Sequence, residues 1–387
     1  MGFKRIGVFT SIRSEYGLLT PVLSRLKSHP TLELKLLVGG AHLSEAFGMS
    51  VDQIKADGFE IAEYLPFLSN DDNGNSFVPM LSRLQNQFGN YLIHNPLDLC
   101  IVLGDRFELL PVVTSCLITN TPIAHISGGE FTEGSIDNQV RHAITKMAHL
   151  HFPATEIYRM NLIRMGEEGW RICVSGEPGL DHIGQLKLIP KSQLFKTLRL
   201  NGNRPVVCCT FHPETIHNQI TPEFVRQCLT AILKESGYQI VVTASNFDPG
   251  GAELNRMFEE LDGQDSRIVY HKSLGQLKFY SLLNSVEVMI GNSSSGLVEA
   301  QSFNLPAVNI GERQRGRLAN LNVYDCPADV PQILGAINHV SSPFFREQYW
   351  GKTNIYGDGN ASERIIKFIN DVNWDRLLIK RNTYTSN

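Results

Sequence analysis

The sequence predicts an α/β fold made of two doubly wound, Rossmann-like domains. Short apolar runs alternate with amphipathic segments of helical length along the whole chain, and a glycine or polar turn follows most of the runs. This alternation is typical of parallel sheets that are covered by helices on both faces. The length of 387 residues exceeds what one hydrophobic core usually supports, which favours two domains.

Apolar runs predict the strands of both domains. The runs of the first half are residues 5–10, 32–38, 98–104, 121–127, 149–154 and 171–176, with helical segments such as 18–26 and 107–117 between them. The runs of the second half are residues 205–212, 238–245, 267–273, 286–291 and 306–311. Two sets of five or six strands predict one parallel sheet in each domain.

Glycine, proline and polar residues cluster at 176–193 and predict the junction between the domains. We expect a first domain at 1–180, which carries candidate catalytic carboxylates, and a second domain at 181–365, which carries a candidate nucleotide site. The remaining segment, 366–387, follows from the helical stretch 361–372 and is a candidate to pack back on the first domain.

The composition argues against several classes of protein. No stretch approaches about 18 consecutive apolar residues and no long like-charge run is present, so neither a membrane span nor disorder is expected. A net charge of −4 provides no general attraction to nucleic acid. Arg13 and Glu15 break the N-terminal apolar stretch, which therefore predicts a first strand and not a signal peptide. The seven cysteines lack CxxC spacing, which predicts reduced thiols and a cytoplasmic protein.

A serine cluster follows the apolar run 286–290, where the chain continues as GNSSSGLVE. Ligands of open parallel sheets bind beyond the carboxyl ends of the strands, and small residues at a helix start allow N–H groups and hydroxyls to converge on phosphate. A simpler interpretation is an ordinary capped helix start. The neighbouring GERQRGR brings three arginines to the next strand end, and together the two motifs predict a nucleotide diphosphate site. Its candidate residues are Ser293, Ser294, Ser295, Gly296, Glu299, Arg313 and Arg317.

Three carboxylates follow apolar runs or glycine turns in the first domain: Asp105, Glu130 and Asp137. Alone, Asp105 is expected to cap the helix that begins at Phe107. Three carboxylates at the strand ends of one domain, however, favour general acid and base chemistry. His212, after the run 205–212, is a candidate to contact phosphate or to move a proton.

A metal site and a nicotinamide site are the competing interpretations. His142, His149 and His151 have no carboxylate or thiolate partner at metal-ligand spacing, so we interpret them as structural. No predicted strand is followed by G-x-G-x-x-G. Neither a metal nor another cofactor is therefore expected.

Seven motifs in order give the chain a family resemblance. They are SIRSEYG (11–17), GDRFE (104–108), HISGGEFTEGSIDNQVRHAITK (125–146), FHPET (211–215), SNFDPGG (245–251), GNSSSGLVE (291–299) and GERQRGR (311–317). From residue 5 to about 370, the chain resembles the hydrolysing UDP-N-acetylglucosamine 2-epimerases of sialic-acid biosynthesis. Close relatives in that family act on UDP-N,N′-diacetylbacillosamine.

The resemblance implies a fold of the glycosyltransferase-B type, with the two domains facing a central cleft. It also implies release of UDP through a 2-acetamidoglucal, followed by hydration to the free C2-epimer, which is N-acetylmannosamine when the substrate is UDP-N-acetylglucosamine. The expected partners are the UDP-sugar, UDP and further copies of the chain in a dimer or tetramer, and no redox cofactor is needed.

The resemblance also implies roles for individual residues. Asp105 and Asp137 correspond to carboxylates of the catalytic cleft, and Arg13, Arg106 and Arg141 to residues that face the nucleotide sugar.

In the second domain, His212 corresponds to a histidine near the phosphates, with Asn246 and His271 nearby. The remaining correspondences are the diphosphate and ribose contacts Ser293, Ser294 and Glu299, and the phosphate helpers Arg313 and Arg317.

Two positions depart from the family pattern. The first turn has Ser11-Ile12-Arg13 where relatives usually have Gly-Thr-Arg or Gly-Ser-Arg, and Ser127 stands where many relatives have an acidic residue or a histidine. A serine needs help to act as a base near neutral pH. Either Glu130 or Asp137 takes that role, or Ser127 marks a different sugar specificity.

Other functions are compatible with the same predicted fold. A glycosyltransferase would consume an acceptor and release no free epimer, and a non-hydrolysing epimerase would return the UDP-sugar. A regulatory binder of nucleotide sugars would not need the three carboxylates. The motifs favour the hydrolysing epimerase.

Overall fold

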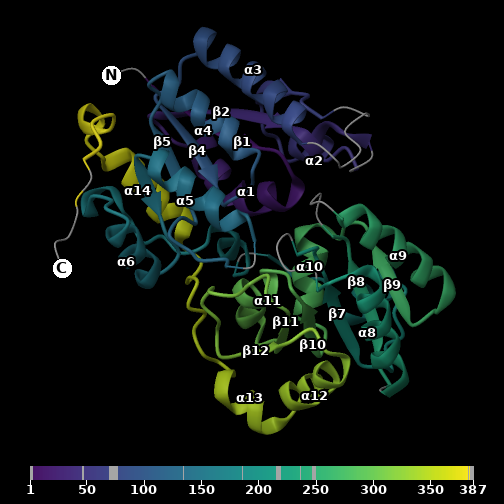
Figure 1. The fold of residues 1–387 in the computed structure, drawn as a ribbon. Helices are drawn as coiled ribbons and strands as arrows, with labels where there is room; N and C mark the ends of the chain where they lie inside the picture. The colour runs from purple at the N-terminus through teal and green to yellow at the C-terminus, as the bar shows by residue number, and fades with distance from the viewer. Residues whose placement is uncertain are drawn as a thin grey trace. The chain divides into compact units, whose positions relative to one another are not determined.

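The computed structural model describes residues 3–45, 48–68, 77–133, 135–184, 186–214, 219–235, 237–245, 250–381 and 383. The chain divides into two compact units (Figure 1). The first unit comprises Met1–Glu130, Asp137–Gly184 and Tyr356–Asn387, and the second comprises Phe131–Ile136 and Gln185–Ile355. Each unit contains one six-stranded parallel sheet, which confirms the predicted fold class.

The sheet of the first unit has the order β3-β2-β1-β4-β5-β6. Its strands are β1 (Lys4–Thr10), β2 (Leu32–Gly39), β3 (Ile61–Leu65), β4 (Leu99–Leu103), β5 (Ile123–Ile126) and β6 (Leu150–Phe152). The α-helices of this unit are α1 (Arg13–Lys27), α2 (Val51–Ala56), α3 (Val78–His94), α4 (Leu109–Ile118), α5 (Asp137–Met147), α6 (Glu156–Arg164) and α14 (Ala361–Asp371). Short 3-10 helices are η1 (Gly40–Leu43), η3 (Gly169–Arg171), η4 (Pro178–His182) and η6 (Trp374–Arg376).

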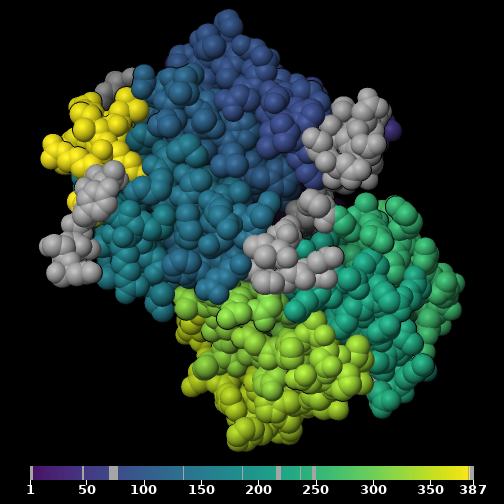
Figure 2. All heavy atoms as spheres, viewed as in Figure 1, coloured from purple at the N-terminus to yellow at the C-terminus, as the bar shows by residue number. Residues whose placement is uncertain are grey.

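Helix α14 belongs to the core of the first unit although it lies near the end of the chain. Ile365, Ile366 and Ile369 share one helical face and are buried with residues of α1, β1 and β2. The Asp181 carboxylate accepts hydrogen bonds from the first two N–H groups of α14, at 2.8 and 2.7 Å. Figure 1 shows α14 in yellow among the blue and teal elements of this unit, and Figure 2 shows C-terminal residues covering part of its surface.

The sheet of the second unit has the order β12-β11-β10-β7-β8-β9. Its strands are β7 (Val206–Thr210), β8 (Gln239–Thr243), β9 (Ile268–His271), β10 (Val288–Gly291), β11 (Ala307–Ile310) and β12 (Val323–Cys326). Its α-helices are α7 (Lys191–Thr197), α8 (Pro222–Glu235), α9 (Gly251–Gln264), α10 (Gly275–Leu283), α11 (Ser295–Val298), α12 (Val330–Val340) and α13 (Pro343–Tyr349), and the 3-10 helix η5 covers Ala300–Phe303. Strands β7, β8, β10 and β11 pack with α8, α9 and α12 in one apolar cluster.

Both units have the same doubly wound strand order. In each, the first strand of the unit (β1 or β7) lies inside the sheet, and the chain builds outward first on one side and then on the other. The order therefore reverses between β1 and β4 and between β7 and β10. Ligands of doubly wound sheets bind at such switch points, beyond the carboxyl ends of the strands.

Three strand predictions differ from the structure. Residues 171–176 were expected to form a strand, but only one isolated bridge, between His151 and Ile172, forms there. Strands β3 and β12 were not predicted. Both are edge strands with partly exposed side chains, so neither appears as a continuous apolar run.

All seven cysteines are free thiols, and six of them are buried. Within the described ranges, no helix is both long and apolar enough to cross a membrane.

Candidate functional site

His212 and Asn292 are tied together at the switch point of the second unit. The Asn292 side chain accepts a hydrogen bond from the His212 N–H at 2.7 Å and donates one to the His212 carbonyl at 2.8 Å. Asn292 is fully buried, and His212 is 5% exposed. The Ser245 hydroxyl lies 3.4 Å from Nδ1 of His212. A buried amide therefore fixes the backbone that carries His212 to the backbone that leads into the serine cluster.

Asn292 also connects the serine cluster to the arginine motif. The backbone carbonyl of Asn292 accepts hydrogen bonds from the Arg313 side chain at 3.2 Å and from the buried Gln314 side chain at 2.9 Å. Gln314 in turn accepts a bond from Arg317 at 3.3 Å. Sequence patterns pointed to the arginines but not to Asn292 or Gln314, because the bonds that give these amides a role are long-range.

The helix after the serine cluster is short. Helix α11 has only four residues, and η5 follows it, so Glu299 stands directly after the last residue of α11. A four-residue helix has a small macrodipole, since the macrodipole sums aligned peptide groups. The groups of this turn that could attract an anion are therefore the hydroxyls and amides of the cluster and the nearby arginines.

Glu299 is a buried residue, and one of its two carboxylate oxygens is available to accept a hydrogen bond. The residue is 8% exposed, and its Oε2 atom has no hydrogen-bond partner among the described residues. Burial raises the pKa of the Glu299 carboxyl to about 7. A buried carboxylate oxygen with no partner is suited to accept bonds from hydroxyl groups of a ligand.

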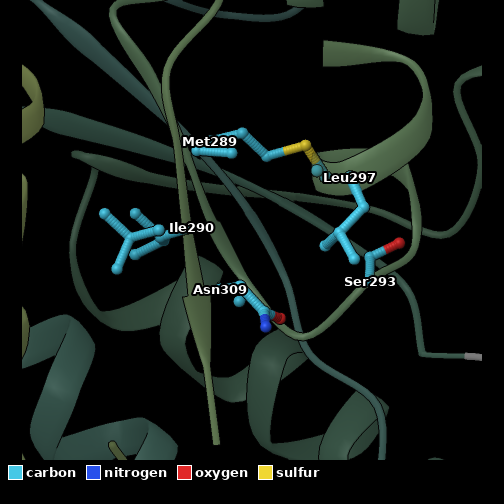
Figure 3. Close-up of a pocket in the computed structure, with 9 residues that line it drawn as sticks. Met289, Ile290, Ser293, Leu297 and Asn309 are labelled. Atoms are coloured by element: carbon cyan, nitrogen blue, oxygen red, sulfur yellow. The ribbon is translucent and has the colours of Figure 1, made fainter. Parts of the chain in front are cut away.

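A small pocket lies beneath α11, between that helix and strands β10 and β11 (Figure 3). Met289 and Leu297 approach each other on one side of β10, and Ile290 points to the other side (Figure 3). The lining is mainly apolar, with Ser293 and Asn309 as its polar side chains. We interpret the pocket as a packing gap of the core, because a diphosphate needs more polar partners than this lining offers.

Asp105 pairs with a buried arginine at the switch point of the first unit. The Arg141 guanidinium is fully buried, forms an ion pair with Asp105 and donates a bond to the Glu130 carbonyl at 3.1 Å. Helix α4 begins at Leu109, and the side chain of its N-cap residue, Glu108, makes no capping hydrogen bond. The helix therefore starts two residues later than predicted, and the contact that the structure gives Asp105 is its ion pair with Arg141.

A second cluster of charged side chains, Arg106, Glu108 and Glu15, lies near the end of β1. Arg106 bonds Oε1 of the buried Glu108 at 2.8 Å. Glu15 accepts bonds from the Thr10 hydroxyl at 3.1 Å and from the Ser11 N–H at 2.8 Å, and burial raises its pKa to about 7.

His42 and Arg13 also lie near the end of β1. His42 lies 3.1 Å from the Thr10 hydroxyl and 2.7 Å from the Ser50 hydroxyl, and burial lowers its pKa to about 4. The nearby Arg13 lowers the pKa of His42 further. Glu15, Glu108 and His42 are buried polar residues that the sequence did not single out.

The end of β5 contributes a serine–carboxylate pair. The Ser127 hydroxyl donates to the two carboxylate oxygens of Glu177, at 2.8 and 3.0 Å, and both residues are buried. Glu177 lies in the predicted domain junction and was not a candidate site residue.

The other candidates are more dispersed. Asp137 is the first residue of α5, and the six residues between Glu130 and Asp137 belong to the second unit. His271 is the last residue of β9, which lies two strands from β7. Burial lowers the pKa of His271, and the positive charge of Arg199 lowers it further. Asn246 lies outside the described residues.

The three histidines weighed as metal ligands have other partners. His149 accepts from the Ile123 N–H at 3.1 Å, and His151 lies 3.0 Å from the buried Glu167 carboxylate. Burial lowers the pKa of His142, His149 and His151. Across the described part of the chain, no group of three or more metal-ligating side chains has an arrangement that could hold a metal ion.

Comparisons with known proteins extend over nearly the whole chain. The family model described as UDP-N-acetylglucosamine 2-epimerase matches residues 24–370. The GDP/UDP-N,N′-diacetylbacillosamine 2-epimerase (hydrolyzing) of Campylobacter jejuni is 31% identical over 98% of this chain and 99% of the relative. The UDP-N,N′-diacetylbacillosamine 2-epimerase (hydrolyzing) of Legionella pneumophila is 32% identical over 98% of this chain and all of the relative. The crystal structure of UDP-GlcNAc 2-epimerase from Neisseria meningitidis bound to UDP-GlcNAc superimposes with a TM-score of 0.82 at 18% identity, covering 96% of this chain and all of that one.

The two parallel six-stranded sheets and this structural match define a fold of the glycosyltransferase-B type. Within that class, the chain belongs to the UDP-N-acetylglucosamine 2-epimerase family and is a hydrolysing UDP-sugar 2-epimerase. The family resemblance of the sequence motifs is thereby confirmed.

Proposed function

We propose that this enzyme converts a UDP-2-acetamido sugar into UDP and the free C2-epimer of the sugar. The second unit would bind the UDP group, and the first unit would supply the groups that move protons. The observation that supports this division most directly is the difference between the two switch points. The buried Asn292 amide holds the His212 backbone, and the Ser245 hydroxyl lies near the His212 ring, whereas Asp105 forms an ion pair with Arg141 and the adjacent Arg106 pairs with Glu108.

The chemistry explains why both kinds of group are needed. The C2–H bond of the sugar is not acidic in the ground state. When the C1–O bond to UDP breaks, positive charge at C1 acidifies C2–H, and a base removes that proton to leave a 2-acetamidoglycal. Water then adds at C1 while a proton returns to C2 from the opposite face, so the reaction ends in hydrolysis.

We assign stabilisation of the departing diphosphate to Ser293, Ser294, Arg313 and Arg317, as hydrogen-bond donors at the developing charge. Glu299 would accept bonds from the ribose hydroxyls, which its buried Oε2 is suited to do.

Further contacts are assigned to the remaining candidates. His212 would contact the phosphates from the opposite side of the second unit's switch point. Asp105, Glu130 and Asp137 are the proposed acids and bases, and Arg13, Arg106 and Arg141 the proposed partners of the nucleotide sugar.

Two sugars are candidates for the substrate. UDP-N-acetylglucosamine is the sugar that names the family that the motifs resemble, and it would place the product, N-acetylmannosamine, in sialic-acid biosynthesis. UDP-N,N′-diacetylbacillosamine is favoured by the two relatives at 31% and 32% identity, both of which are described as acting on that sugar. Ser127 is a candidate marker for this second specificity. We also propose that the enzyme acts as a cytoplasmic homo-oligomer, a dimer or a tetramer.

Incubation with each UDP-sugar, followed by separation of nucleotide and sugar products, tests the proposal. We expect UDP and a free C2-epimer in equal amounts, with kcat/KM at least about tenfold higher for one sugar than for the other. Transfer of the sugar to an added acceptor, or recovery of an epimerised UDP-sugar, would refute hydrolysing epimerisation.

A further inference from the structure

Ser127 and Glu177 form a buried hydroxyl–carboxylate pair from two distant parts of the first unit. Ser127 is the first residue after β5, and Glu177 immediately precedes η4. The Ser127 hydroxyl lies 2.8 Å from Oε1 and 3.0 Å from Oε2 of Glu177. Ser127 is 8% exposed and Glu177 is 7% exposed, so the hydrogen bond is largely shielded from water. In this environment a charge-assisted hydrogen bond is strong.

The pair lies at the same sheet edge as Asp105. The β4–β5 register places Leu103 opposite Ile126, and the Gly104 N–H donates to the Ile126 carbonyl at 3.0 Å. Asp105 and Ser127 therefore follow neighbouring strands at their carboxyl ends, where ligands of such sheets bind.

The backbone at Ser127 adopts a conformation that serine rarely has. Its φ is 63°, in the left-handed region. The two residues that follow are glycines, and a Cβ atom at Gly129 would lie 2.5 Å from the Tyr158 carbonyl oxygen. The turn thus brings the serine hydroxyl to Glu177 at a cost in backbone strain. Strain of this kind concentrates at functional sites.

The position of Glu177 is fixed by the C-terminal part of the first unit. Its N–H donates to the Tyr356 carbonyl at 2.8 Å, and the Tyr356 hydroxyl lies 3.1 Å from that of Tyr158. Four residues after Glu177, Asp181 caps the start of α14. A carboxylate held in this way needs little reorganisation to accept a proton.

We propose that Glu177 accepts the C2 proton of the substrate through the Ser127 hydroxyl; this inference rests on the proposed function. The C2–H bond breaks as Ser127 Oγ gains that proton, and the original hydroxyl proton of Ser127 passes to a Glu177 oxygen. The electron pair of the C2–H bond forms the C1–C2 double bond, while the pair of the C1–O bond leaves with UDP. Glu177, now neutral, releases its proton to solvent before the next turnover.

This role differs from a purely structural one in a measurable way. A structural hydrogen bond needs only an acceptor for the Ser127 hydroxyl, and a glutamine at position 177 provides one of nearly the same size. Proton acceptance needs the carboxylate. Glu177→Gln therefore separates the two roles, and Glu60→Gln, at an exposed position of the same unit, is the matched control.

The experiment follows exchange of the C2 hydrogen in heavy water, kcat and UDP affinity for each variant. We expect Glu177→Gln to lower kcat and C2 exchange at least about 100-fold, the usual scale for a lost acid or base, with UDP affinity within about twofold of wild type. The double variant Ser127→Glu, Glu177→Ser moves the carboxylate across the pair at constant total volume. It should recover at least about tenfold in kcat over Glu177→Ser alone, since the carboxylate then meets the sugar directly.

Two results would overturn the proposal: a kcat of Glu177→Gln within about threefold of wild type, or losses of kcat and UDP affinity in equal proportion. Wild-type enzyme that turns over neither UDP-sugar would instead refute the proposed function. The wild-type assay therefore distinguishes the failure of the proposed function from that of this inference.

Discussion

The strand ends between β1 and β4 and those between β7 and β10 are equivalent places in two units of the same topology, yet they carry different chemistry. In the first unit, Asp105 forms an ion pair with the fully buried Arg141, and Arg106 pairs with Glu108. In the second unit, an amide, Asn292, joins His212 to the serine cluster. The fold supplies the position of a site, and the side chains placed there determine its chemistry. We therefore expect different kinetic effects for variants of the two units.

The largest effect is expected in the first unit. Asp105→Asn should lower kcat at least about 100-fold, since the amide cannot act as acid or base, while UDP affinity stays within about threefold. Glu130→Gln and Asp137→Asn should behave alike, and Asp52→Asn on the exposed face of α2 is the control. Steady-state kinetics with UDP titration measures both quantities. Full activity of all three variants would remove the carboxylates from the mechanism.

The second-largest effect is expected in the second unit and concerns UDP binding. Ser294→Ala combined with Glu299→Ala should weaken UDP binding at least about tenfold, because each lost bond to a ligand contributes on the order of 1 kcal/mol. The value of kcat at saturating substrate should change much less. Ser192→Ala in the exposed part of α7 serves as the control, with affinities measured by calorimetry. Unchanged affinity in the double variant would reduce the serine motif to an ordinary helix start.

A smaller effect tests the positioning of His212. Asn292→Ala leaves the buried His212 N–H and carbonyl without their amide partner, which should destabilise the protein by about 1–3 kcal/mol. UDP affinity should fall as well, because the side chain that ties His212 to the backbone leading into the serine cluster is lost. Asn292→Asp keeps the acceptor for the His212 N–H and should lie between wild type and alanine. Thermal denaturation with and without UDP separates the two losses, and equal ligand-induced shifts in all three proteins would contradict a link to the nucleotide.

The smallest effect concerns pH and the buried Glu15. Its folded-state pKa, about 7, lies above the ordinary value of 4.5. The folded state therefore retains the proton more strongly, so this contribution to stability is present below pH 4.5 and is lost as the pH rises through 7. Glu15→Gln cannot ionise and should lose about 3 °C less in Tm than wild type between pH 5 and pH 8. Parallel Tm curves for the two proteins would show that Glu15 does not titrate in this range.

The sequence was informative where one local signal is enough. Continuous apolar runs located the buried inner strands of both sheets and the edge strands β6 and β9, whereas the partly exposed edge strands β3 and β12 carried no such signal. Residues 171–176 are apolar enough for a strand, but Arg171 donates to carbonyls of the C-terminal segment and the pairing stops at one bridge. The serine and arginine motifs were visible as motifs. The roles of Asn292, Gln314 and Glu177 depend on partners far away in the chain, which no local pattern predicts.

We propose that proton transfer at C2 and loss of UDP occur in one reaction. Proton NMR of the wild-type enzyme in heavy water, with UDP-N-acetylglucosamine and then with UDP-N,N′-diacetylbacillosamine, tests it most directly. We expect that one of these substrates yields UDP and a free C2-epimer with deuterium at C2. Release of UDP with hydrogen retained at C2, or a free sugar of unchanged configuration, would contradict it.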